Sequence, residues 1–99
     1  MKEMLMFLSS LRSSYYLYIG DGDLIALKHF IDGYLICLQN TGKLDDPNDY
    51  NDFCSFMEQH YQFDNSSISI YQKIQQHSSS IHEAFTTFFD LLDEFLKNS

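Results

Sequence analysis

The sequence is poor in cysteine, in positive charge and in long apolar runs. Its two cysteines, Cys37 and Cys54, are far apart and have no CxxC spacing, a pattern that favours reduced core thiols in a cytoplasmic protein. No stretch approaches the roughly 20 apolar residues of a membrane-spanning helix, and no secretory signal pattern begins the chain. We therefore expect a cytoplasmic protein that does not associate with membranes.

Positive charge is scarce, because only six Lys and Arg accompany fourteen Asp and Glu, which gives a net charge of −8. A surface this negative repels nucleic acid and anionic lipid, so we expect neither as a partner. It attracts a basic protein instead. The alternative interpretation is that the charge only keeps the protein soluble.

The apolar residues are sufficient for a core, since they make up 44% of the 99 residues, with aromatics at 16%. At this length they favour one domain, residues 1–99, that folds without disulfides or metal. The apolar positions recur at helical spacing along most of the chain. We predict an all-α, single-domain bundle of about five helices, roughly 2–12, 22–40, 47–61, 66–76 and 81–97.

Two segments are less regular than the others. The segment 66–76 also fits a strand, because Ile68 and Ile70 alternate with polar residues. The segment 14–23, SYYLYIGDGD, is expected to be a tight connection that buries its aromatic side chains.

Local signals mark the helix ends. Either Asp21 or Asp23 caps the helix predicted at 22–40, and Gly42 is suited to the left-handed conformation that ends it. The glycine in the middle of that helix, Gly33, costs about 1 kcal/mol relative to alanine and predicts close approach by another segment. Ser80 and Glu83 form a capping box at the start of the last helix.

The stretch 43–53, KLDDPNDYNDF, places four carboxylates in eight positions around the only proline. Proline suits the first position of a helix, so Asp46 is predicted to cap a helix that starts at Pro47. Asp49 then falls in the first turn, where the helix dipole favours negative charge. A calcium loop requires a central glycine and a closing glutamate, which the stretch lacks. With no paired histidines elsewhere, we predict no metal and no cofactor.

No catalytic motif is present. The chain has no GxSxG, no phosphate-binding glycine loop and no HExxH sequence. Both cysteines lie on predicted apolar helix faces, where thiols are usually unreactive, so we do not expect an enzyme. An enzyme with Cys37 or Cys54 as nucleophile stays open as an alternative.

The acidic stretch is the predicted partner-binding site. It comprises Asp45, Asp46, Asp49 and Asp52, with Tyr50 as an aromatic anchor. The alternative is a solvated helix start with no partner. The C-terminal helix is apolar over more than one stripe, through Phe89 and Leu91, which leaves room for a homodimer contact.

Several short blocks resemble a group of small bacterial proteins. These proteins have a Tyr-apolar-Gly turn followed by a helix with Phe-Ile-x-Gly-Tyr. The blocks in this chain are Leu17-Tyr18-Ile19-Gly20, Phe30-Ile31-Asp32-Gly33-Tyr34, Phe53-Cys54-Ser55-Phe56 and the helix containing Ala84-Phe85 and Phe88-Phe89.

The group resembles toxin-immunity proteins, which are encoded beside secreted bacterial toxins. The resemblance implies a non-enzymatic protein that neutralises a basic toxin domain, for instance a nuclease, by occluding its active cleft. The alternative function is a small structural or regulatory homodimer. The choice of Asp45, Asp46, Asp49, Tyr50 and Asp52 rests on charge and position in this chain, because the matched residues of the group read as structural.

Overall fold

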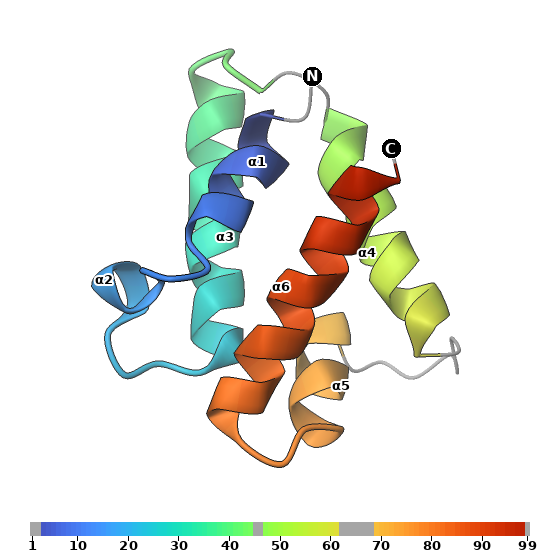
Figure 1. Ribbon diagram of the computed structural model, residues 1–99. Helices are drawn as coiled ribbons and strands as arrows, with labels where there is room; N and C mark the ends of the chain where they lie inside the picture. Colours follow the sequence, from blue (N-terminus) through green and yellow to red (C-terminus); the bar gives the residue numbers. More distant parts are fainter. Residues whose placement is uncertain (1–2, 45–46, 62–68, 99) are drawn as a thin grey trace.

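The computed structural model describes residues 3–44, 47–61 and 69–98, which form an all-α bundle without strands (Figure 1). This confirms the predicted fold class. The helices in these residues are α1 (Glu3–Ser10), α2 (Tyr16–Ile19), α3 (Leu24–Asn40), α4 (Pro47–His60), α5 (Ile70–Gln76) and α6 (Ile81–Lys97).

The helix starts follow local capping. α4 begins at Pro47 and α6 at Ile81, as predicted. α3 begins two residues later than expected, because Asp23 is the cap and accepts a hydrogen bond from the Ala26 amide at 3.1 Å.

α5 begins at Ile70 and not at residue 66. Its cap is Ser69, whose hydroxyl accepts from the amide of Gln72 at 3.3 Å, while the Gln72 side chain accepts from the amide of Ser69 at 3.4 Å. This reciprocal pair fixes the start of the helix. Residues 66–68, the start of the predicted element, lie outside the described residues.

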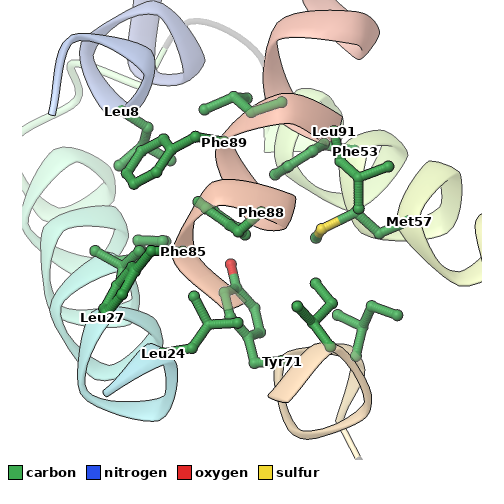
Figure 2. Close-up of a cluster of buried hydrophobic side chains, with 14 of the residues drawn as sticks. Leu8, Leu24, Leu27, Phe53, Met57, Tyr71, Phe85, Phe88, Phe89 and Leu91 are labelled. Atoms are coloured by element: carbon green, nitrogen blue, oxygen red, sulfur yellow. The ribbon is translucent and has the colours of Figure 1, made fainter. Parts of the chain in front are cut away.

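α6 is the central helix of the bundle and contacts α1, α3, α4 and α5 (Figure 1). Figure 2 shows Phe85, Phe88 and Phe89 projecting from α6 among the side chains of its neighbours. The ring of Phe88 lies 5.7 Å from that of Phe53 and 5.4 Å from that of Tyr71, measured between centroids. The broad apolar surface of α6 therefore packs against the other helices of the bundle.

The capping box of α6 differs from the expected one in its second half. Ser80 accepts a hydrogen bond from the Glu83 amide at 3.1 Å, as predicted. The Glu83 carboxylate, however, accepts from the amide and the hydroxyl of Ser79 and not from the amide of Ser80. These bonds stabilise the ionised form, so they lower the pKa of Glu83.

The connection before α3 contains a helical turn that the sequence did not predict. The side chains of Tyr16 and Tyr18 in α2 are 58% and 48% exposed, so the prediction that this segment buries its aromatics is wrong for them, and Leu17 between them is 72% exposed. A single helical turn directs its side chains all round, and only one side of α2 faces α3. Tyr15 does pack inward, stacked on Phe85 with 4.1 Å between ring centroids.

The end of α3 matches its predicted signal. Gly42 adopts a φ of 69°, in the left-handed region, and its amide donates to the carbonyl of Gln39 at 3.2 Å. The amide of Lys43 donates to the carbonyl of Leu38 at 2.9 Å. Together the two bonds form a Schellman motif.

Gly33, in the middle of α3, does not have the predicted close neighbour. It is exposed, and no atom lies within 4 Å of the position that a Cβ would occupy. The ring of Tyr18 packs instead beside Phe30, with 5.2 Å between centroids. The subunit itself therefore leaves this part of the α3 backbone uncovered.

Candidate functional site

α4 has one buried face and one exposed polar face. Phe53 and Met57 are fully buried against the rest of the bundle. The exposed face of α4, which we call the α4 face, consists of Asn48, Asn51, Asp52, Ser55, Gln59 and His60. It contains a carboxylate and no Lys or Arg.

The structure describes three of the five predicted site residues. Asp45 and Asp46 lie outside the described residues. Asp49 lies in the first turn of α4, half-buried, and Asp52 lies three residues further on and is exposed. Residues three apart are neighbours on a helix surface, so these two carboxylates lie on adjacent parts of α4.

Tyr50, the predicted aromatic anchor, is half-buried and directed into the bundle. Its hydroxyl lies 2.8 Å from that of Tyr71, which is 1% exposed. Burial raises the pKa of both phenols well above the usual value, so both are neutral at physiological pH. The hydroxyl of Tyr50 is thus engaged with α5, and its role toward a partner stays a prediction.

A polar cluster that the sequence did not reveal surrounds this tyrosine pair. Cys54 lies beside Tyr50, and burial raises the pKa of its thiol. Asp32 of α3 acts electrostatically on Tyr50 and Cys54, and it accepts a hydrogen bond from Lys28 at 2.7 Å. The i, i+4 spacings of Tyr50 with Cys54 and of Lys28 with Asp32 are visible in the sequence, but they do not show which helices meet.

The two cysteines differ in burial and in environment. A thiol with a raised pKa is protonated at neutral pH and reacts slowly, which applies to Cys54. Cys37 is exposed, so the expectation of two core thiols is wrong for it. It lies on the outward side of α3, one helical turn from Gly33, and outside the buried stripe of Leu24, Leu27 and Ile31.

Two of the described positive charges, Arg12 and Lys28, pair with carboxylates of α6 and α3. Arg12 of the α1–α2 connection donates hydrogen bonds to Asp90 and, at 2.5 Å, to Asp93 on α6. Lys28 pairs with Asp32 on α3, and Lys73 is buried. Among the described residues, no Lys, Arg or His lies within 4.0 Å of the Asp52 carboxylate.

The chain around α4 has a strong charge imbalance. Between Lys43 and Lys73 the sequence contains no Lys or Arg. The same interval holds Asp45, Asp46, Asp49, Asp52, Glu58 and Asp64. The sequence around α4 therefore carries a negative charge that no Lys or Arg between Lys43 and Lys73 balances.

Three hollows formed by the described residues have volumes of about 60, 120 and 190 Å³. A hollow of about 120 Å³ lies between the α1–α2 connection and α6, beside Tyr15 and His82, which is below the roughly 300–1,000 Å³ of small-molecule sites. In the described ranges, no three His, Cys, Asp or Glu side chains are grouped as metal ligands. None of the helices described here has the length and apolarity to cross a membrane.

Comparisons with protein-family models, with curated protein sequences and with solved structures found no match. The functional interpretation therefore rests on the charge and geometry of the subunit.

Proposed function

We propose that this protein is a non-enzymatic binding protein that neutralises a basic toxin domain by covering its active cleft. The observation that carries the proposal is the negative charge of α4. Asp49 and Asp52 lie on this helix, and the α4 face has no Lys or Arg. Negative surfaces of this kind accelerate association with basic proteins and orient them.

The α4 face is suited to this task because the opposite side of α4 is fixed against the rest of the bundle. Phe53 and Met57 anchor α4 in the core, and the Tyr50–Tyr71 hydrogen bond joins it to α5. A carboxylate on a fixed helix loses little freedom on binding, so more of the interaction energy appears as affinity. A guanidinium of the partner donates two parallel hydrogen bonds to such a carboxylate, which gives directional recognition.

Neutralisation by occlusion requires no chemistry from this protein. A nuclease-type toxin carries Lys and Arg around its cleft to bind phosphates, and the same side chains are the ones that an acidic helix attracts. The proposed contact is therefore competitive with the substrate of the toxin.

The test is capture of the partner from the lysate and secreted fraction of the source cell. The variant Asp45→Lys/Asp52→Lys reverses two charges in the proposed site. Asp21→Lys/Glu94→Lys is the matched control, because it changes the net charge by the same amount at exposed positions outside α4. We expect the wild type and the control to retain one basic protein, and the site variant to lose it.

The retained protein is then purified and assayed for activity with and without the wild type. We expect its activity to be inhibited, and the inhibition to weaken as salt screens the charges. Equal retention by the site variant and the control would place the contact elsewhere on the surface. Binding without inhibition would refute occlusion.

A further inference from the structure

The chain contains two Asp-Gly pairs, and the structure places them in different surroundings. Asp21-Gly22 lies in the connection between α2 and α3, which runs along the edge of the bundle in Figure 1. Asp21 is exposed, and within the described part of the chain no hydrogen bond or ion pair engages its carboxylate. Asp32-Gly33 lies in the middle of α3, where Asp32 accepts a hydrogen bond from Lys28 at 2.7 Å.

An aspartate that precedes a glycine can rearrange its own backbone. The nitrogen of the glycine amide attacks the side-chain carboxyl carbon, a water molecule leaves, and a succinimide ring forms. Water then opens the ring at either of its carbonyl groups, which gives back aspartate or gives isoaspartate, in which the main chain continues through the side-chain carboxyl group. The composition is unchanged, and no oxidant or cofactor takes part. Glycine favours the attack because it has no Cβ to obstruct the approach.

The helix hinders this rearrangement at Asp32. The amide of Gly33 belongs to the hydrogen-bonded interior of a 17-residue helix. The helical ψ of about −42° holds its nitrogen away from the side-chain carboxyl carbon of the preceding residue. Ring closure at Asp32 therefore requires local unfolding of α3, which the fully buried side chains of Leu27 and Ile31 oppose.

The turn at Asp21 has weaker protection. The amide of Gly22 donates a hydrogen bond to the carbonyl of Ile19 at 3.0 Å, at the end of the four-residue helix α2. No side chain of α2 is buried. Short elements with few buried contacts open locally at a low cost in free energy. Opening of this turn frees the Gly22 amide to attack the Asp21 carboxyl group.

Packing nevertheless requires glycine after Asp21. A Cβ on residue 22 would lie 2.6 Å from the Cβ of Ala26 and 3.0 Å from the carbonyl oxygen of Ile19, which are both closer than normal contacts. The first turn of α3 therefore packs against the bare backbone of Gly22. The fold itself thus keeps the residue that makes Asp21 reactive.

We propose that Asp21 is a site of isoaspartate formation and that Asp32 is not. The modification lengthens the main chain by one carbon atom directly before the start of α3. It displaces Gly22 from its close packing against Ala26, so we expect the modified protein to be less stable. The inference does not depend on the proposed function.

The bonds affected by this change join the start of α3 to α5. Asp23 caps α3 and also accepts a hydrogen bond from the side-chain amide of Gln75 at 3.3 Å. The side-chain oxygen of Gln75 in turn accepts from the amide of Leu24 at 3.0 Å. A longer backbone before Asp23 shifts this cap relative to α5 and weakens the bonds between them.

Incubation of the full chain for several weeks, at physiological temperature and mildly acidic pH, tests the proposal. Proteolytic mapping by mass spectrometry, with a fragmentation method that distinguishes isoaspartate from aspartate, gives the yield at each position. We expect at least about ten times more isoaspartate at Asp21 than at Asp32, because α3 must open for the second reaction. In urea, where the chain is unfolded, the two positions should react at similar rates.

Asp21→Glu removes the site but keeps its charge, because glutamate forms the corresponding larger ring far more slowly. Asp32→Glu is the matched control and should leave the yield at Asp21 unchanged. We expect the isolated isoaspartate form of the wild type to melt at a lower temperature than fresh protein, and incubated Asp21→Glu to melt like its fresh form.

Equal yields at the two positions of the folded protein would overturn the proposal. So would a folded chain in which Asp21 stays intact while the chain in urea reacts. An isoaspartate form that melts like fresh protein would overturn the expected effect on the start of α3.

Discussion

Replacing Tyr50 and Tyr71 by phenylalanine, singly and together, measures whether Tyr50 stabilises the bundle from inside. The two hydroxyls are 2.8 Å apart and belong to α4 and α5. Each single replacement removes one partner and leaves the other hydroxyl with fewer hydrogen bonds in a protein interior. The double replacement removes both, so nothing is left unpaired.

The burial of Tyr71 determines how much stability the replacement Tyr50→Phe should cost. Because Tyr71 is 1% exposed, water cannot replace its partner in Tyr50→Phe. A buried group left without its hydrogen bond costs about 1–3 kcal/mol, and each kcal/mol lowers the Tm of a domain this size by about 4–8 °C. Tyr71→Phe should cost less, because Cys54 neighbours the Tyr50 hydroxyl and its thiol is a weak substitute partner.

Urea denaturation followed by far-UV circular dichroism gives the free energy of unfolding of the four proteins in the cycle. We expect the double replacement to be less destabilising than the sum of the singles, with a coupling of about 1 kcal/mol. Additivity within about 0.3 kcal/mol would show that the hydroxyls do not stabilise each other. Tyr50 would then be available as the aromatic anchor of a partner surface.

Two further predictions concern the thiols and one carboxylate. At neutral pH a maleimide should modify the exposed thiol of Cys37 well before that of Cys54, because burial raises the pKa of the Cys54 thiol. Mass spectrometry measures the two labelling rates. Equal rates, or unchanged labelling in Cys37→Ser, would contradict this prediction. The lowered pKa of Glu83 stabilises the fold above the ordinary carboxylate pKa, and this contribution is lost as pH falls through the lowered value. Ser79→Ala should therefore raise the pKa of Glu83 in an NMR titration, and an unchanged pKa would exclude the Ser79 hydroxyl bond as its cause.

The sequence predicted the helices well where their ends depend on nearby residues. Pro47, Ser80 and Gly42 act through bonds or steric limits that span only a few positions. α2 was missed because a single turn is too short to show a helical period.

The charge of the candidate site could be predicted from the sequence, but the directions of its side chains could be predicted only in part. The excess of carboxylates around α4 can be read directly from the sequence. The direction of Tyr50 depends on contact with Tyr71, which is 21 residues away along the chain. The exposure of Cys37 likewise depends on which side of α3 the other helices cover.

By itself the sequence determined the helical class, most helix boundaries and the negative charge, because propensity, capping and composition are local properties. Only the tertiary structure decided which faces stay exposed. It turned Tyr50 inward, left Gly33 uncovered and placed Asp52 on the outside. The physical reason is that the burial of a side chain depends on neighbours that are distant in the sequence. In this bundle α6 brings such neighbours together, because it contacts α1, α3, α4 and α5.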